Sequence, residues 1–317
     1  MSKSVNWRAL APVAVFVALC LVIALFSPNF LSVSNGLRIL NAAAIPLVLV
    51  MGATFVILMG SIDLSVEGVV ALCAVVTSAL VLNNQTSADL GFLAIPVAIV
   101  VGGLIGLANG AAHVHLRIPS FMATLGVGFA CLGIATAVLG GFPVRISDTA
   151  FRALTLGRTF GVPHGVWVAA AAVALAYLIQ ERTRLGRWVY AIGTDEVTAR
   201  HSGVPVERTR ILVFALAGLF SGLAGAMAAS QLGQGHALIA QGRLFTTITA
   251  VVVGGTALSG GVGSVLNSVI GVLIVVVLTN GMVLMGIPPF VQLGVQGLLI
   301  IVAVALALDR RQMAIVK

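Results

Sequence analysis

Residues 39–82 read ILNAAAIPLVLVMGATFVILMGSIDLSVEGVVALCAVVTSALVL, which is two apolar runs separated by one short polar stretch. The runs, residues 39–60 and 64–82, each have about the 20 residues that an α-helix needs to cross a hydrocarbon core roughly 30 Å thick. Asp63 and Glu67, the first two acidic residues of the chain, stand where the runs meet. The stretch therefore predicts two membrane-spanning helices joined by a tight, partly polar connection.

Apolar runs of this kind recur along the whole chain. Of its 317 residues, 60% are hydrophobic and only 8% are charged, whereas about a quarter of the residues of a soluble domain are charged. The runs are long and unbroken, unlike the alternating strands of about ten residues in a membrane β-barrel. We therefore expect an all-α polytopic membrane protein with about ten transmembrane helices. The expected spans are residues 9–27, 39–60, 64–82, 91–113, 119–140, 164–180, 211–231, 245–259, 264–285 and 290–308.

The positions of lysine and arginine predict the orientation, because cytoplasmic loops carry an excess of both. Ten spans and a cytoplasmic N-terminus place most of the 17 basic residues inside, with both termini in the cytoplasm. The inner residues are Lys3, Arg8, Arg117, Arg182, Arg184, Arg187, Arg200, Arg208, Arg210, Arg310, Arg311 and Lys317. The outer residues are Arg38, Arg145, Arg152, Arg158 and Arg243. Three of these share the loop 141–163, which suggests a function for that loop.

Two distant stretches resemble each other. Residues 109–128, NGAAHVHLRIPSFMATLGVG, and residues 280–297, NGMVLMGIPPFVQLGVQG, share an N-G pair, then I-P-x-F, then L-G-V. The copies end at the fifth and the tenth expected span, so they are five spans apart. Because each span crosses the membrane once, an odd number of spans gives the two copies opposite orientations. We therefore expect an inverted repeat, with halves at roughly 39–140 and 211–308 of one domain, 1–317, as in many transporters.

Several kinds of chemistry are excluded by residues that the chain lacks. Its two lysines are terminal and no G-K-[ST] tripeptide occurs, so the chain does not split ATP through a P-loop. Its five histidines are scattered and its three cysteines lack metal-ligand spacing, so we expect no metal site. The net charge of +8 is explained by orientation signals beside anionic lipid, and we expect no nucleic-acid partner.

The most polar stretch is residues 181–210, ERTRLGRWVYAIGTDEVTARHSGVPVERTR. Signals for membrane orientation would explain its six arginines but not its middle. There, Thr194 can cap a short helix with Asp195 and Glu196 in its first turn, where the helix dipole favours acids. Gly203 and Pro205 would end that helix. A short capped helix on the inner surface is a feature that a partner protein can bind.

Together, several motifs resemble the permease subunits of bacterial ATP-binding-cassette importers for ribose, xylose and related sugars. The matching stretches are GSIDLSV (60–66), GLANGAAHVHLRIPSFMATLG (106–126), GRWVYAIGTDEVTARHSGVPVERTR (186–210), ITAVVVGGTALSGGVGSVLNSVIG (248–271) and QGLLIIVAVALALD (296–309). The resemblance implies a multi-pass protein of the bacterial inner membrane that is not itself an enzyme. It also implies a second permease copy, an extracytoplasmic sugar-binding protein, and a cytoplasmic ATPase that holds the ATP and magnesium; no cofactor is expected in this chain.

The resemblance also implies roles for individual residues. The segment that resembles the coupling helix, which sits on the ATPase, contributes Asp195, Glu196, Ala199, Arg200, Ser202 and Gly203. The residues expected to face the binding protein are Arg145, Arg152 and Arg158. The chain departs from the pattern at Glu67, where the family usually has glycine. It departs again in the coupling segment and at LFTTIT (244–249), which lacks an acidic residue common there, so the particular sugar is not assigned.

A permease that receives its cargo from a binding protein needs no tight site of its own. We therefore expect a pathway or helix junction formed by small, weakly polar groups: Asp63, Ser65, Asn109, Thr124 and Asn280. Asp63 or Ser65 could cap the helix that follows, with Glu67 in its first turn; alternatively the carboxylates contact cargo or a proton. A nucleoside or branched-chain amino-acid importer and an ion-coupled secondary transporter are the functional alternatives.

Overall fold

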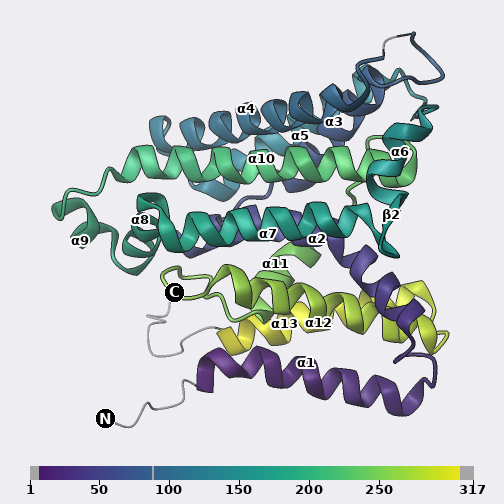
Figure 1. The fold of residues 1–317 in the computed structure, drawn as a ribbon. Coiled ribbons are helices and arrows are strands. Elements are labelled where there is room, and N and C mark those ends of the chain that lie inside the picture. The colour runs from purple at the N-terminus through teal and green to yellow at the C-terminus, as the bar shows by residue number, and fades with distance from the viewer. Residues whose placement is uncertain (1–6, 88, 308–317) are drawn as a thin grey trace.

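The computed structural model describes residues 7–87 and 89–307, and Figure 1 shows them as a bundle of roughly parallel helices. Lys3, Arg310, Arg311 and Lys317 of the expected inner set lie outside the described residues, as does the last residue of the expected tenth span. Within the described part the chain is predominantly helical, as predicted.

Ten apolar helices overlap the ten predicted runs, with bounds that differ by several residues. They are α1 (Trp7–Phe26), α2 (Val33–Leu58), α3 (Val66–Leu80), α4 (Ala94–His115), α5 (Ser120–Leu139), α7 (His164–Arg182), α10 (Val206–Leu232), α11 (Arg243–Val253), α12 (Val265–Leu284) and α13 (Pro289–Ala307). Six helices of the described chain are long and apolar enough to cross a membrane, and four shorter apolar helices, within α1, α3, α11 and α13, complete the set.

The remaining elements lie at the two ends of the bundle, which are named here by the helix found at each (Figure 1). The α9 end carries α8 (Arg184–Thr194) and α9 (Glu196–His201). The α6 end carries α6 (Thr149–Leu156), the short 3-10 helix η1 (Gly91–Leu93) and four two-residue strands: β1 (Val144–Arg145), β2 (Arg158–Thr159), β3 (Val162–Pro163) and β4 (Gln234–Gly235). β1 pairs with β4 and β2 with β3, both antiparallel; these short pairs, which the sequence did not predict, add to a fold that is otherwise helical.

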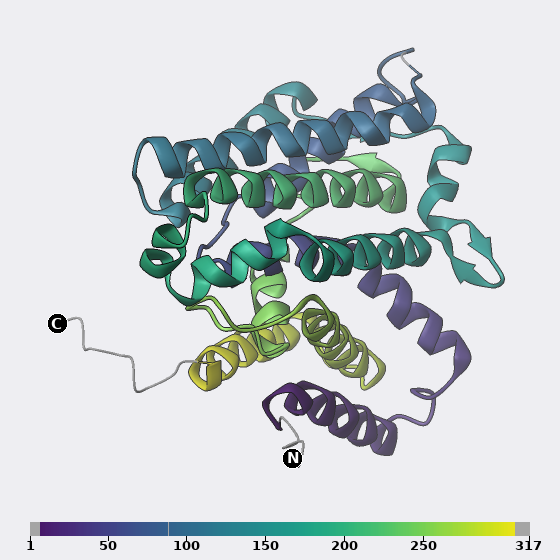
Figure 2. The same ribbon diagram turned by 60° about the vertical axis from the view of Figure 1, so that its left-hand side comes forward.

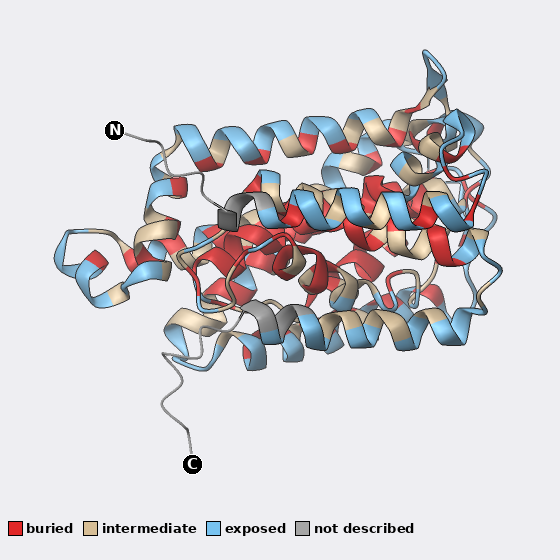
Figure 3. Ribbon diagram, turned by 90° about the horizontal axis from the view of Figure 1, so that it is seen from below, coloured by how far each residue is buried: buried red, intermediate tan, exposed pale blue. Residues whose placement is uncertain are grey.

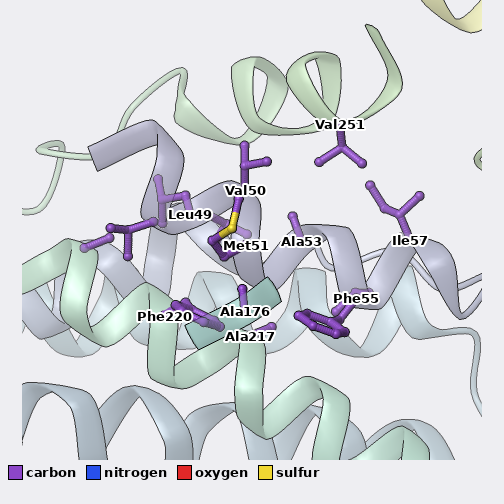
Figure 4. Close-up of a cluster of buried hydrophobic side chains, with 14 of the residues drawn as sticks. Leu49, Val50, Met51, Ala53, Phe55, Ile57, Ala176, Ala217, Phe220 and Val251 are labelled. Carbon is purple, nitrogen blue, oxygen red and sulfur yellow. The ribbon is translucent and has the colours of Figure 1, made fainter. Parts of the chain in front are cut away.

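Helix α2 lies at the centre of the core. Figures 1 and 2 show it with α7 between a layer of α3, α4, α5 and α10 and a layer of α1, α11, α12 and α13. Figure 4 shows Val50 and Ile57 on the side of α2 nearer Val251 of α11, and Phe55 on the side nearer Ala217. Figure 3 shows buried residues concentrated inside the bundle and exposed ones on its peripheral helices.

Helices α4 and α10 approach so closely that only glycine fits between them. A Cβ atom added at Gly102 would overlap the carbonyl oxygen of Gly218, and one at Gly106 would overlap that of Phe214. Gly222 likewise approaches the backbone of Ala98, so the contact continues along the helices (Figure 2). Small residues allow such an approach in lipid, where dispersion contacts rather than the hydrophobic effect hold helices together.

Helix α11 is shorter than predicted. It ends at Val253 rather than at residue 259, and its 11 residues span about 16 Å, roughly half of a hydrocarbon core. Residues 254–264 form a connection in which Gly255, Gly260, Gly261 and Gly263 have positive φ. Residues other than glycine rarely adopt this conformation, so the glycine run ends the helix there.

Candidate functional site

A polar cluster occupies the connection between α2 and α3 at the α9 end. The Asp63 Oδ1 atom accepts two hydrogen bonds from Ser65, from its backbone nitrogen at 2.8 Å and from its hydroxyl at 2.6 Å. The Ser65 hydroxyl in turn accepts a hydrogen bond of 2.8 Å from the Nδ2 atom of Asn109, on α4. Ser65 and Asn109 are each about 1% exposed, so the cluster joins α4 to the connection inside the protein.

The N-terminal part of α5 binds the same connection from the other side. The Thr124 hydroxyl accepts a hydrogen bond of 2.9 Å from the Leu64 backbone nitrogen, and the Ser120 hydroxyl accepts one of 3.1 Å from that of Ile62. These bonds satisfy two N–H groups that no helix pairs, and unpaired buried N–H groups are costly. Residues 62–65 are therefore hydrogen-bonded to both α4 and α5.

Four of the five predicted pathway residues, namely Asp63, Ser65, Asn109 and Thr124, thus lie together, and the fifth does not. Asn280, on α12, exchanges two hydrogen bonds of 3.0 Å with Asn35, on α2. The pair lies at the α6 end of the bundle, away from the cluster. Asn35 and Ser120 were not among the predicted residues, although Ser120 stands in the quoted I-P-S-F motif and Asn35 begins an N-G pair like those of Asn109 and Asn280.

Ser65 was predicted as a possible side-chain cap, and this is wrong. It is the N-cap residue of α3, but its hydroxyl makes no capping bond to the helix. The hydroxyl donates to Asp63 instead. Asp63 likewise bonds Ser65 itself rather than the first turn of α3, so its carboxylate fixes the approach to the helix and not the helix end.

We predict that Asp63→Asn leaves stability nearly unchanged and that Asp63→Ala lowers it by about 1–3 kcal/mol, because only alanine removes the acceptor of two bonds from buried Ser65. Thermal unfolding of the detergent-solubilised protein measures the difference. Equal losses in the two variants would show that the charge of Asp63, and not only its acceptor oxygen, stabilises the connection.

Glu67 is in the first turn of α3, as predicted, but its carboxylate binds elsewhere. Its Oε1 atom accepts a hydrogen bond of 3.1 Å from the backbone nitrogen of Leu244, in the first turn of α11. A carboxylate at that position also interacts favourably with the positive end of the α11 dipole. Glu67 therefore links α3 to the start of the short helix α11, a role that the sequence did not indicate.

We predict that Glu67→Gln retains this link, because its amide oxygen accepts the same bond, and that Glu67→Ala destabilises the protein by about 0.5–2 kcal/mol through loss of a helix cap. The measurement is the midpoint of thermal unfolding for both variants beside the unaltered protein. An alanine variant as stable as the unaltered protein would contradict the assigned link.

At the α9 end the predicted short helix is present, although its cap differs from the prediction. Asp195 rather than Thr194 is the N-cap of α9: its Oδ1 atom accepts hydrogen bonds from the backbone nitrogens of Val197 and Thr198, at 2.9 and 3.1 Å. The Thr194 hydroxyl donates instead to the Tyr190 carbonyl, within α8. Gly203, with φ of 81°, follows the end of α9 as predicted.

Hydrogen bonds from the side chain and the backbone of Thr198 hold the pKa of Asp195 below its usual value. A carboxyl whose pKa is lower in the folded state stabilises that state above the unfolded-state pKa. This contribution is lost as the pH falls through the folded-state pKa. The cap of α9 is therefore intact at neutral pH.

Charged side chains fix α9 against the start of α10. Glu196 forms ion pairs with Arg210 at 2.6 Å and with Arg200 at 3.2 Å, and Arg200 also pairs with Glu207. Of the remaining predicted coupling residues, Ala199 is buried, and Ser202 is exposed and donates to the Thr198 carbonyl. Val197, which the sequence analysis did not select, projects from α9 with 64% of its surface exposed.

The three arginines predicted to face a binding protein lie at the α6 end, but they are not equivalent. Arg145 and Arg158 are exposed, in β1 and β2. Arg152 is only partly exposed and its guanidinium lies beside Gly233, at the end of α10. Its Nε atom is buried without a hydrogen-bond partner among the described residues. Arg145 and Arg158 are therefore the better placed to contact a partner.

Two hollows accompany these sites. A cavity of about 110 Å³ beside Asp63 is lined mainly by apolar side chains of α2, α3 and α11. A more open hollow of about 350 Å³ at the α6 end is lined in part by Thr136, Phe142, Gln234 and His236. Pockets that enclose small organic ligands usually measure about 300–1,000 Å³, so the cavity beside Asp63 is too small for one. Among the described residues, no cluster of His, Cys, Asp or Glu could hold a metal ion.

Comparison with known proteins gives a consistent set of relatives. Residues 35–304 match the family described as the permease component of the branched-chain amino acid transport system. The chain is 36% identical over 297 residues to the ribose import permease protein RbsC of Haemophilus influenzae, covering 91% of this chain and 90% of that one. It is 36% identical to the L-arabinose transport system permease protein AraH of Escherichia coli, with 94% and 90% covered. It is 34% identical to RbsC of Bacillus subtilis, with 97% and 94% covered.

No solved structure matches the chain. The match to the family includes the polar cluster, α9 and the glycine run that follows α11, and so covers most of the elements described above.

Proposed function

Because this chain belongs to the family of the permease component of the branched-chain amino acid transport system, we propose that it is the membrane-spanning subunit of an ATP-driven importer for a monosaccharide. The observation that carries the choice of cargo is the near full-length similarity to permeases named for ribose and for L-arabinose. Pentoses are therefore the first sugars to test.

We propose that all ten apolar helices lie in the bacterial inner membrane, with the α9 end in the cytoplasm. The arginines of the two ends support this orientation, because Arg117, Arg182, Arg184, Arg187, Arg200, Arg208 and Arg210 lie at or near the α9 end. The helix lengths support an inverted repeat: α2 to α5 have 26, 15, 22 and 20 residues, and α10 to α13 have 27, 11, 20 and 19.

The proposed partners are those of a binding-protein-dependent importer. A separate ATPase subunit binds α9, where Val197 supplies an exposed apolar contact beside the charged network of Glu196, Arg200 and Glu207. An extracytoplasmic sugar-binding protein contacts the α6 end near Arg145 and Arg158. A second permease copy completes the pathway. ATP binding by the ATPase then switches the pathway between outward and inward access.

Reconstitution tests this proposal. The permease, its ATPase and its binding protein are placed in liposomes, and uptake of D-ribose and L-arabinose is measured with and without ATP. We expect uptake only with ATP and with sugar-loaded binding protein, and ATP hydrolysis that rises when the loaded protein is added. Hydrolysis that does not respond to the loaded binding protein would contradict the proposal. Uptake that persists without ATP and collapses with an uncoupler would identify an ion-coupled transporter instead.

The family description mentions branched-chain amino acids, so leucine serves as the competing cargo in the same assay. Uptake of leucine in place of both pentoses would assign the chain to amino-acid import.

A further inference from the structure

Three backbone segments meet at the α9 end of the bundle. They are the end of α2 (58–60), Gly193 near the end of α8, and residues 259–261 of the connection between α11 and α12. The Gly261 backbone nitrogen donates a hydrogen bond of 2.8 Å to the Leu58 carbonyl. We call this meeting point the glycine junction.

Glycine is required on every side of the glycine junction. A Cβ atom at Gly193 would overlap the Leu58 carbonyl oxygen and lie 2.5 Å from the Gly261 nitrogen. One at Gly260 would lie 2.8 Å from the Gly60 nitrogen and 3.0 Å from the Gly193 Cα atom. All of these neighbours are backbone atoms, which cannot turn away as a flexible side chain does. The three segments are therefore in direct backbone contact.

Hydrogen bonds hold the same elements together around the junction. The Tyr190 hydroxyl, on α8, donates a bond of 2.7 Å to the Gly263 carbonyl. The Gln180 Oε1 atom, on α7, accepts a bond of 2.7 Å from the Val265 backbone nitrogen at the start of α12, and Gln180 is buried. The α7–α8 segment is therefore fastened to the connection before α12 at more than one point.

The glycine junction lies between α9 and the polar cluster. Asp195 both ends α8 and caps α9, so Gly193 is two residues from the start of the proposed ATPase contact. On the other side, Gly60 leads within three residues to Asp63. Residues 259–261 belong to the connection that follows α11, and the first turn of α11 donates a hydrogen bond to Glu67. A displacement of α9 would thus reach both connections through closely packed backbone.

Resting on the function proposed above, we propose that Gly193 is a positioning residue that transmits movement of α9 to the α2–α3 and α11–α12 connections, and so couples ATP hydrolysis to opening of the pathway. Gly193 is suited to transmit this movement because its backbone is in direct contact with the backbones of the other two segments. Packed backbone atoms move as one body, whereas a gap or a flexible side chain would absorb a displacement of about 1 Å.

The test measures sugar imported per ATP hydrolysed in the reconstituted complex. In Gly193→Ala the added methyl group separates α8 from Leu58 and Gly261. We expect the ratio to fall by roughly tenfold, the size of a typical coupling free energy, while the ATPase remains bound and hydrolyses ATP. Gly36→Ala, on α2, is the matched control, because nothing lies within 4 Å of an added Cβ there; its ratio should equal that of the unaltered protein.

If Gly193→Ala leaves the amount of sugar imported per ATP hydrolysed unchanged, the proposal is wrong. It is also wrong if uptake and hydrolysis fall in parallel, because that result indicates a packing role alone. If Gly193→Ala does not assemble with the ATPase, Tyr190→Phe is the second variant that tests the coupling. Loss of its bond to Gly263 should lower the ratio by about 2- to 10-fold, and an unchanged ratio would refute the coupling. Absence of coupled uptake by the unaltered protein would instead contradict the proposed function.

Discussion

Gly218→Val yields little or no folded protein after extraction from the membrane. An added Cβ atom at Gly218 overlaps the carbonyl oxygen of Gly102 and lies 3.0 Å from the Cα atom of Gly106. Valine therefore forces α4 and α10 apart along the contact between them, and overpacking that no side chain can relieve costs more than about 4 kcal/mol. The stability of a typical domain is only about 5–15 kcal/mol, so most of it is lost.

The measurement is the amount of monodisperse protein recovered in mild detergent. Gly133→Val, in α5, is the matched control, because nothing lies within 4 Å of an added Cβ at Gly133. We expect its yield to stay near that of the unaltered protein. Recovery of folded Gly218→Val at a similar yield would mean that α4 and α10 do not pack as closely as described.

Glu196→Lys abolishes uptake while leaving the permease folded. The reversal replaces the partner of Arg200 and Arg210 with a third cation, so α9 loses its ion pair with Arg210 of α10 and keeps the pair between Arg200 and Glu207. It also places a positive charge in the first turn of α9, where the helix dipole disfavours it. The side chain is 37% exposed and lies outside the core, so the bundle itself tolerates the change. Uptake in the reconstituted system should fall by at least about tenfold.

The charge-swapped double variant, Glu196→Lys with Arg210→Glu, provides the control. It restores an oppositely charged pair between α9 and α10, and we expect part of the uptake to return. Co-purification of the ATPase reports on whether α9 still binds its partner. Normal uptake by the single variant would show that the charged network does not position α9.

Apart from the end of α11, the sequence predicted where the apolar helices lie, because unbroken hydrophobic runs of this length have few alternatives in lipid. It also predicted four members of the polar cluster, because the motifs that contain Ser65, Asn109 and Thr124 stand at the ends of those runs. The α6 end was predicted poorly: its strands are two residues long, and pairing between β1 and β4 depends on where α5 and α10 end in space.

The contacts that the sequence did not reveal have a common physical cause. Asn280 was predicted as a small, weakly polar group of the pathway or helix junction, and its hydrogen-bond partner, Asn35, lies 245 residues away in the sequence. The partner of Glu67 is a backbone nitrogen, which every residue except proline has, so no sequence motif marks it. Thr194 and Asp195 are both good caps, and the choice between them depends on α8, which the apolar pattern did not reveal.

The pair of Asn35 and Asn280 also has a consequence for how the protein is made. Each amide satisfies the other, but the two are separated by 245 residues. At a synthesis rate of roughly 5–20 residues per second, Asn35 waits about 12–50 s before Asn280 emerges from the ribosome. During that interval α2 carries an amide without its final partner at the membrane. The pairing of the two amides therefore waits for the arrival of α12, and slowing translation between the two helices should prolong the lifetime of a protease-sensitive intermediate.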